Sequence, residues 1–440
     1  MSDVIDGGGK RPGLPRSVGI VAGAVGIAAL IIVVVVTQSG PRHSVAPQPP
    51  GSSFTAASAA PTATVATAIQ PVPVPVTGSA AEWPSAPGAC GSTALLPQRT
   101  LALHYGHVAG SVLIGGASLQ VVRLDQPSTT PVAGGPDSSG LVDALVSAPN
   151  AAYAQVAPCG ATRGGEGTLY RVEAGAAHRL TGSGRGWLVG GEHHAWGVQY
   201  PSQINPSGSA PVNAGPTLTP LDGGRAITLA TNAYLFADTT TGMVVGVDDP
   251  ANPDMPPTVE VVDATTGTVV RTFVGGSLKA AQGRDLILQT GSCAAPQTPP
   301  LPCALQRRDL VTGQTTGDYP LPVGRSPVSV AIFSPDRNLI AFQLARTIHD
   351  VRFATDFPPS DIAILHLDTG RLSIVPNLEF APKTEVGLAF DATGNSLLAA
   401  INNGDHGELL IWQEGMTGPA LVTSIPGPLD APPPLLVTRQ

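Results

Sequence analysis

Residues 362–370 read Ile-Ala-Ile-Leu-His-Leu-Asp-Thr-Gly, and residues 259–267 read Val-Glu-Val-Val-Asp-Ala-Thr-Thr-Gly. In both stretches a short run rich in Val, Ile and Leu leads into an acidic residue and then a glycine, which is the pattern of a strand followed by a tight hairpin turn. Residues 308–313, Arg-Asp-Leu-Val-Thr-Gly, end in the same way. The turn residues of these copies are Asp263, Gly267, Asp309, Gly313, Asp368 and Gly370.

Weaker copies of this pattern extend over most of the chain. Asp125, Glu173 and Asp222 occupy the corresponding point and a seventh copy ends near Gln413, so the anchors follow one another after 48, 49, 41, 46, 59 and 45 residues. A period in the forties built from strands and turns is typical of β-propeller blades. A pair of β-sandwiches or a β-helix explains this period less well. The sequence therefore predicts an all-β protein, a β-propeller of about seven blades, with about six to eight possible.

One copy also carries a family resemblance. Residues 332–342 read Ile-Phe-Ser-Pro-Asp-Arg-Asn-Leu-Ile-Ala-Phe, and together with residues 361–370 they resemble the repeat of WD40-like propellers of the TolB type. Asp336 is the turn residue of this copy, and residues 388–399 look like the next one. Arg337 and Asn338 stand where the family usually has a glycine. The resemblance is specific over residues 326–412 and implies a fold, not a function, because propellers include enzymes, receptors and scaffolds.

Residues 18–36 form an uninterrupted run of 19 apolar or glycine residues. As a helix this run is roughly 28 Å long, close to the hydrocarbon thickness of a bilayer, so residues 17–37 are predicted to form a transmembrane helix. A cleaved signal peptide is the alternative, but its apolar region usually has only about 7–15 residues. Lys10, Arg11 and Arg16 precede the run and Arg42 alone follows it closely. The positive-inside rule therefore predicts a cytoplasmic tail at residues 1–16 and an extracytoplasmic C-terminal domain.

Residues 38–82 are predicted to be a disordered linker rich in Pro, Ala and Thr. Between residues 41 and 80 there are eight prolines and one formally charged residue, Arg42. Such a segment cannot bury enough apolar surface to fold, and it suits a stalk that holds residues 83–440, the predicted propeller domain, away from the membrane. Its composition would also suit O-glycosylation.

The four cysteines, Cys90, Cys159, Cys293 and Cys303, all follow the predicted membrane span. An even number of cysteines in an exported domain predicts two disulfides, for which three pairings are possible. Pairing of Cys293 with Cys303 is favoured because the loop between them is short and closes at little cost in chain entropy. That pairing would leave Cys90 and Cys159 to join each other. A metal site would need closely spaced cysteine pairs, and the sequence has none.

Composition limits the classes of partner. The chain has 23 basic and 31 acidic residues, a net charge of −8, and charged residues make up only 12% of it. No basic stripe is present that could neutralise phosphates, which excludes nucleic acid as a partner. The Ala-, Gly- and Arg-rich, lysine-poor composition is typical of a high-GC bacterium, here of the actinobacterial type.

No catalytic or cofactor motif is present: the nucleophile elbow, the P-loop, the dinucleotide fingerprint and the zinc-protease motif are all absent from the sequence. Weaker candidates are the run of residues 192–194 (Glu-His-His), the pair His104 and His107, and the acidic loop at residues 248–254. Neighbouring residues on a strand point to opposite faces, so His193 and His194 do not readily share an ion. Asp361 likewise alternates away from His366 and Asp368. We expect no metal, no cofactor and no catalytic residue among these groups, which are more typical of turns.

The sequence thus predicts a membrane-anchored β-propeller that acts as a binding or scaffolding module of the bacterial cell envelope. Its expected partners are the membrane, through the single helix, and a protein, peptide or glycan at one end of the propeller channel. Two alternatives stay open. One is a hydrolase or lyase acting on envelope material, which would need at least two titratable groups converging on one pocket. The other is a sensor domain that signals through a partner.

Overall fold

The computed structural model describes residues 101–438 with gaps at 103, 137–139, 159–165, 174, 186, 201–214, 250–256, 292, 294–302, 347–358, 381–383, 404–405 and 431. The predicted cytoplasmic tail, membrane span and linker lie outside the described residues, as do Cys90, Cys159 and the predicted domain boundary at residue 83. In the described part of the chain, no helix has the length and apolar character needed to cross a bilayer.

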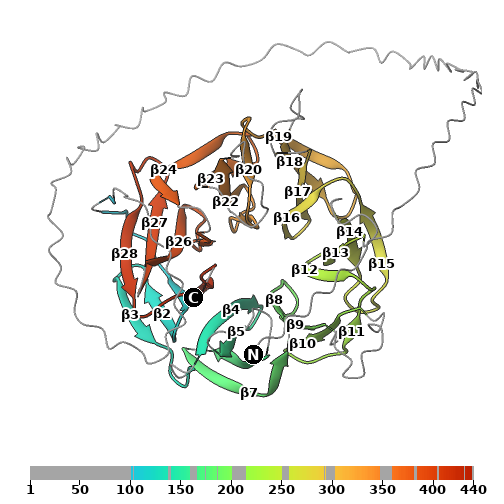
Figure 1. The fold of residues 1–440 in the computed structure, drawn as a ribbon, viewed down its shortest axis with the longest axis horizontal. Helices are drawn as coiled ribbons and strands as arrows, with labels where there is room; N and C mark the ends of the chain where they lie inside the picture. Colours follow the sequence, from blue (N-terminus) through green and yellow to red (C-terminus); the bar gives the residue numbers. More distant parts are fainter. Residues whose placement is uncertain are drawn as a thin grey trace, which may run out of the picture. The chain divides into compact units, whose positions relative to one another are not determined.

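The described strands form seven antiparallel sheets arranged around a central axis, which is the architecture of a seven-bladed β-propeller (Figure 1). The predicted all-β propeller is confirmed, and the blade number is seven. From the centre outward, blade 1 contains β29 (Leu435–Thr438), β1 (Ser111–Gly115), β2 (Leu119–Arg123) and β3 (Ser128–Pro131). Blade 2 contains β4 (Gly140–Ala148), β5 (Ala151–Pro158), β6 (Glu166–Glu173) and β7 (Ala176–Arg185).

The next three blades repeat this order. Blade 3 contains β8 (Trp187–Val189), β9 (Trp196–Gln199), β10 (Thr217–Pro220) and β11 (Ile227–Thr228). Blade 4 contains β12 (Ala233–Thr239), β13 (Gly242–Val247), β14 (Thr258–Val262) and β15 (Val269–Phe273). Blade 5 contains β16 (Ser277–Gln282), β17 (Asp285–Thr290), β18 (Ala304–Asp309) and β19 (Thr315–Pro320).

The last two blades differ slightly from each other. In blade 6 the inner position is divided between β20 (Arg325–Pro327) and β21 (Ile332–Phe333), which both pair with β22 (Leu339–Arg346). Blade 6 continues with β23 (Ser360–His366) and β24 (Leu372–Phe380). Blade 7 contains β25 (Gly387–Phe390), β26 (Ser396–Asn403), β27 (His406–Gln413) and β28 (Ala420–Ile425).

The ring is closed by strand pairing between the two ends of the propeller. The C-terminal strand β29 forms the inner strand of blade 1 and pairs antiparallel with β1, with Val112 opposite Val437. The side chains of Ser111 and Thr438 are also hydrogen-bonded at 2.7 Å. Blade 1 is therefore built from strands at both ends of the described chain.

Seven clusters of buried apolar side chains lie between neighbouring blades, one at each interface. Blades 7 and 1 share a cluster that includes Ile411 and Val112, and blades 5 and 6 share one that includes Leu305 and Phe342. The other five interfaces are filled in the same way. A four-stranded sheet can bury both of its apolar faces only against the next sheet, so the ring is the arrangement that buries every blade.

The repeat anchors from Asp125 to Gln413 all lie at one place in the fold, where the third strand of each blade turns into the fourth, whereas Asp336 lies between β21 and β22. Asp263 Oδ1 accepts hydrogen bonds from the backbone N–H groups of Thr265 (2.9 Å) and Thr266 (2.7 Å). Gly267 closes this turn by donating its N–H to the Asp263 carbonyl, and its positive φ of 74° explains the glycine. Bonds from the backbone and the hydroxyl of Thr266 lower the pKa of Asp263.

Two further copies show which part of the turn is kept and which part varies. Asp309 accepts the N–H groups of Val311 and Thr312, and the hydrogen bond from the Thr312 backbone is the main cause that lowers the Asp309 pKa to about 2. In blade 6 the N–H of Gly370 donates to the carbonyl of His366. His366 therefore holds the place of Asp309, and Asp368 lies two positions later, where it accepts the N–H of Thr369 at 2.8 Å.

The turn between β21 and β22 contains the departure from the TolB-type repeat. Arg337 has a φ of 60°, the left-handed conformation that the family's glycine would adopt. Asp336 supports the turn by accepting hydrogen bonds from Ser334 Oγ (2.6 Å) and the Asn338 N–H (3.2 Å), and the Ser334 bond is the main cause of its lowered pKa. Arg337 also lies 3.7 Å from a carboxylate oxygen of Asp285 in blade 5.

Candidate functional site

A cavity of about 500 Å³ lies among the inner strands. Its walls come from blades 1, 2, 3, 6 and 7, so residues that are far apart in the sequence meet there. Most of the lining is aliphatic, aromatic or proline. The lining residues are Asp143, Ala144, Leu145, Val146, Gln155, Trp187, Leu188, Val328, Ser329, Val330, Ile332, Gln343, Glu385, Val386, Gly387, Leu388, Pro432, Pro433, Pro434 and Leu435.

Blade 6 contributes to the cavity at the point where its inner strand is interrupted. Residues 328–331 separate β20 from β21, and three of them line the space. Gln343 on the neighbouring strand fixes this region: its Nε2 donates to Ser360 Oγ (3.1 Å) and to the Thr384 carbonyl (2.9 Å). Its Oε1 accepts the N–H of Val386 at 3.3 Å. A buried, fully engaged amide therefore joins blade 6 to the segment that enters blade 7.

Asp143 reaches the cavity through an irregularity in strand β4. Val142 and Ala144 face successive residues of β5, so Asp143 is the extra residue of a β-bulge. The residue is only 5% exposed and it lines the cavity. Bulges redirect side chains and are frequent beside functional sites, whereas a regular strand would place residue 143 in the alternating pattern of its neighbours.

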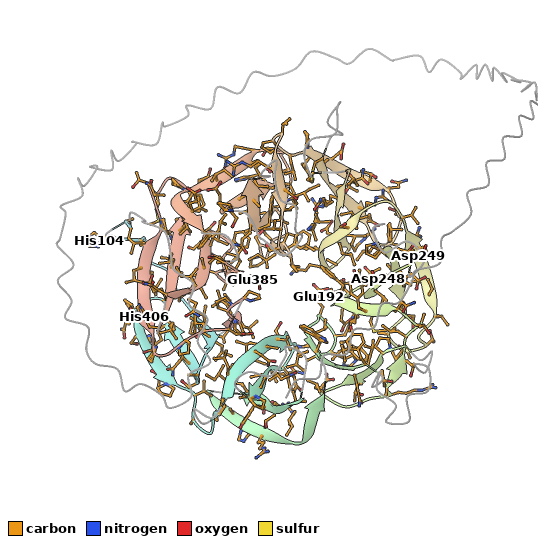
Figure 2. The ribbon with its side chains drawn as sticks, in the orientation of Figure 1. His104, Glu192, Asp248, Asp249, Glu385 and His406 are labelled. Atoms are coloured by element: carbon orange, nitrogen blue, oxygen red, sulfur yellow. A yellow bond between two sulfur atoms is a disulfide. The ribbon has the colours of Figure 1, made fainter. Side chains whose placement is uncertain are left out.

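Two carboxylates, those of Asp143 and Glu385, are the charged groups of the lining as the structure describes it. Glu385 lies beside the central opening of the ring (Figure 2). Trp187 is 43% exposed and Val330 is 59% exposed, and both belong to the lining. These two side chains mark where the cavity meets solvent.

The Glu-His-His run forms a second cluster, at the loop between β8 and β9. Asp238 is buried, and its Oδ2 accepts the N–H of His194 (2.8 Å) and Nε1–H of Trp196 (3.2 Å). Its Oδ1 lies 3.2 Å from Nδ1 of His193. The same loop reaches blades 4 and 5, because Glu192 Oε2 accepts the N–H groups of Thr240 (2.6 Å) and Gly283 (3.1 Å).

The side chains of the two histidines in this run contact different carboxylates. His194 Nδ1 lies 2.8 Å from Asp222, whereas His193 faces Asp238. Among the residues that the structure describes, no group of three or more His, Cys, Asp and Glu side chains is arranged to hold a metal ion. The hydrogen bonds instead join the loop to the blades beside it, so this cluster supports the ring.

The other polar candidates are also separate from one another. Asp361 pairs with Arg325 at 2.5 Å, and His366 Nε2 lies 2.9 Å from the guanidinium of Arg371, the residue before the outer strand β24. His104 lies away from the central opening (Figure 2). Asp248 follows β13, and most of the acidic loop after it lies outside the described residues. None of these groups lines the central cavity.

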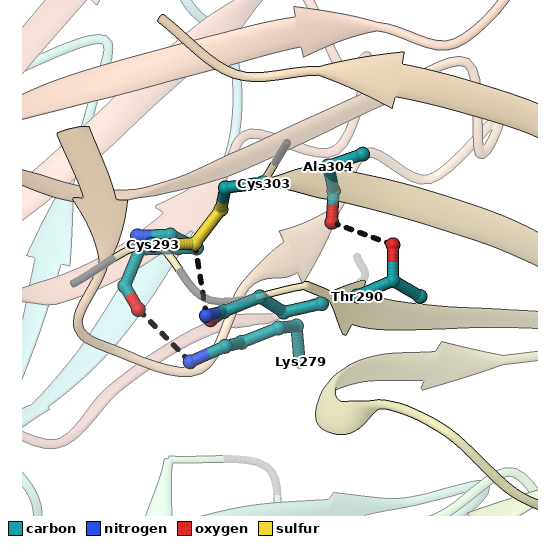
Figure 3. The surroundings of a disulfide bond; sticks show 7 residues. Lys279, Thr290, Cys293, Cys303 and Ala304 are labelled. Atoms are coloured by element: carbon teal, nitrogen blue, oxygen red, sulfur yellow. Dashed lines mark hydrogen bonds between the residues drawn. A yellow bond between two sulfur atoms is a disulfide. The ribbon is translucent and has the colours of Figure 1, made fainter. Parts of the chain in front are cut away.

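A disulfide joins Cys293 and Cys303, as the sequence predicts (Figure 3). Lys279 lies close to this bridge and donates from Nζ to the carbonyl of Pro327 at 2.9 Å, across the interface between blades 5 and 6. Its burial lowers the Lys279 pKa from 10.5 to about 8. Gln289 Nε2 donates to Cys293 Sγ at 3.0 Å. The bridge therefore joins the ends of β17 and β18 in blade 5, and the lysine joins the inner strand of that blade to blade 6.

The fold and the cavity together define a seven-bladed propeller with a largely apolar central site. No protein-family model matches the sequence, and no curated protein sequence matches it. Among solved structures, TolB from Acinetobacter baumannii is similar over 75% of this chain and 67% of its own, at 13% identity and a TM-score of 0.39. Apo AztD from Citrobacter koseri is similar over 75% of this chain and 98% of its own, at 12% identity and a TM-score of 0.42.

A third similar structure is a functionally unknown protein from Desulfotomaculum acetoxidans. It covers 75% of this chain and 99% of its own, at 11% identity and a TM-score of 0.43. Likeness at these levels concerns the fold alone, and shared folds do not transfer a ligand or an activity.

Proposed function

We propose that this chain is a membrane-anchored, extracytoplasmic binding or scaffolding module of the bacterial cell envelope, which holds a protein, peptide or glycan in its central cavity. The observation that carries the proposal is the cavity, about 500 Å³ in volume, lined from five blades and mostly apolar. Ligand sites have this size and this mixture of many apolar and few polar groups. The proposed anchor and export rest on residues 18–36 and on the basic residues that precede them.

Site-specific photocrosslinking tests the cavity. Benzoylphenylalanine replaces Val330, which lines the opening, in the full-length chain expressed in its source cells. A matched control carries the same group at Val323, which is 88% exposed and does not line the cavity. We expect a discrete adduct from position 330 that position 323 does not give. Identical adducts from both positions, or none from position 330, would contradict the proposed binding role.

Protease accessibility tests the anchor and its orientation. The full-length chain carries one epitope tag at each terminus, and protease is added to intact spheroplasts. The C-terminal tag is expected to disappear while the N-terminal tag stays protected until lysis. Protection of both tags would contradict export, and release of the C-terminal part into the medium would indicate a cleaved signal peptide instead.

A hydrolase or lyase acting on envelope material is the second candidate, because Asp143 and Glu385 both line the one cavity. Two carboxylates at a shared site can serve as general acid and base. The test incubates the full-length chain with purified peptidoglycan and measures released fragments, with Asp143→Asn and Glu385→Gln as matched variants. Release by the wild type that both variants abolish would favour this candidate over simple binding. No release by the wild type would remove it.

A further inference from the structure

We propose that the ligand group held in the central cavity is an ammonium attached to an apolar body, such as the amino end of an apolar peptide or an alkyl or aryl amine. The inference rests on the proposed binding function and names the chemistry that the same cavity would select. It combines three observations: the apolar walls, the two carboxylates among them, and an indole at the opening.

The walls select an apolar body. Pro432, Pro433 and Pro434 face the cavity from blade 1, and Val328, Val330 and Ile332 face it from blade 6. Transfer of apolar surface from water to such walls is favourable at about 25 cal/mol per Å². A sugar would leave many hydroxyl groups beside carbon atoms that cannot accept or donate hydrogen bonds, which is costly.

The carboxylates select the charge. Asp143 lines the cavity from blade 2, and Glu385 lines it from the segment that enters blade 7. The described lining contains no Lys, Arg or His. Both residues also interact within the protein. An ammonium can share such carboxylates through charge-assisted hydrogen bonds, whereas a ligand carboxylate would be repelled. The net charge of −8 adds a favourable long-range attraction for cations.

Asp143 lines the cavity from the bulge of β4. The side chain of Trp187, on the neighbouring inner strand β8, also belongs to the lining and is 43% exposed. Indole faces attract organic cations more strongly than other aromatic rings do. An aromatic ring at the opening and two acids in the walls are groups that would stabilise one positive charge within apolar surroundings.

Three probes with one apolar body test the inference: 4-phenylbutylamine, 4-phenylbutanol and 4-phenylbutyrate. Their affinities are measured by isothermal titration calorimetry on the full-length chain in phosphatidylcholine nanodiscs, with empty nanodiscs as the reference. At pH 7.5 we expect the amine to bind about tenfold more tightly than the alcohol, the usual margin of a charge-assisted hydrogen bond, and the butyrate to bind weakest. Leu-Phe-Val amide and its N-acetyl form extend the test to a peptide source of the ammonium.

Glu385→Gln separates charge from shape. It is expected to weaken the amine about tenfold and to leave the alcohol unchanged, because the amide keeps the size of the acid but not its charge. The control, Glu414→Gln, removes an exposed acid that pairs with Arg371 outside the cavity and should change neither probe. If Glu385→Gln does not fold, Asp143→Asn replaces it.

Two results overturn the inference without touching the binding role. One is an alcohol or butyrate that binds as tightly as the amine in the wild type, and the other is an equal loss of amine and alcohol in Glu385→Gln. If no probe binds but benzoylphenylalanine at position 330 still gives its own adduct, the ammonium inference is refuted and the proposed binding role of the cavity is retained. If neither occurs, both proposals fall.

Discussion

Replacement of Glu192 by alanine removes a carboxylate that joins three blades. Glu192 lies in the β8–β9 loop of blade 3, near the central opening (Figure 2). Its Oε2 accepts the N–H of Thr240, in the β12–β13 turn of blade 4, at 2.6 Å. The same oxygen accepts the N–H of Gly283, in the β16–β17 turn of blade 5, at 3.1 Å. Glu192→Ala leaves both donors without this acceptor, and a half-buried position limits how far water can replace it.

The expected cost follows from those two bonds. Hydrogen bonds to a charged group contribute about 1.5–3 kcal/mol each. Thr240 is exposed, so water can partly replace the lost acceptor of its N–H, and we expect a loss of about 2–4 kcal/mol in the free energy of unfolding. A propeller of roughly 340 residues unfolds with an entropy of about 0.7 kcal/mol per kelvin. The loss therefore corresponds to a fall in Tm of about 3–6 °C. Glu192→Gln keeps one acceptor oxygen for both donors and should lose less than half as much.

Thermal unfolding of the full-length chain, followed by tryptophan fluorescence, measures these shifts. The control is Glu414→Ala, which removes an exposed ion pair with Arg371 and should cost at most about 1 kcal/mol. If Glu192→Ala and Glu414→Ala lower Tm equally, the carboxylate does not join the blades as described. If Glu192→Gln is as damaging as Glu192→Ala, charge rather than hydrogen bonding holds the loop.

Three further predictions concern the framework. Asp309 has a pKa of about 2, below its ordinary 3.8, so its stabilising contribution is complete above pH 4 and is lost as pH falls towards 2. Asp309→Asn should therefore lower the free energy of unfolding at neutral pH. The same variant should show a smaller loss of stability between pH 4 and 2 than the wild type, measured by unfolding titrations at each pH. Lys279 has a pKa lowered to about 8, so the unfolded chain binds more protons between pH 8 and 10.5, and stability should rise across that window in the wild type. Lys279→Met should remove about 2 kcal/mol of this rise, measured by chemical unfolding at both pH values. Removal of the disulfide by Cys293→Ser together with Cys303→Ser, which opens a loop with a sequence separation of 10, should cost about 2–3 kcal/mol; an unchanged Tm in that variant would contradict it.

Much of the fold was predictable because the motif that repeats in every blade lies within a few consecutive residues. A strand, an acidic residue and a glycine describe one turn, and the turn recurs wherever a blade passes from its third to its fourth strand. Asp125, Glu173 and Asp222 look unrelated in sequence, yet each lies at the end of the third strand of its blade or within two residues after it, as Asp263 does. The spacing between such points therefore indicates blades even where the residues differ. The closing strand β29 carries no such motif, since its partner β1 lies more than 300 positions earlier in the chain.

The cavity could not be predicted in this way. Asp143, Trp187, Val330, Glu385 and Pro433 come from five different blades, and no short pattern joins them. The bulge that brings Asp143 to the cavity depends on how β4 pairs with β5, which the residues around it do not reveal. The sequence did draw attention to Glu192, His193 and His194, but their contacts, with Asp238 among others, make them part of the framework.

Register shifts occur in the inner and the outer strand pairs of the described blades. On the inner side, β4, β12 and β16 each contain one. On the outer side, the pairs β6–β7, β14–β15, β18–β19, β23–β24 and β27–β28 each contain one as well. A bulge is therefore part of the repeat, and the residue at the bulge is what differs: Asp143 lines the cavity, whereas Phe236 and Lys279, the bulge residues of β12 and β16, do not. Blade 6 is different because its inner position is divided between β20 and β21, and residues 328–330, between those strands, line the cavity. The departure from the repeat in blade 6 and the acid at the β4 bulge thus meet in one cavity, which is why we expect the ligand there.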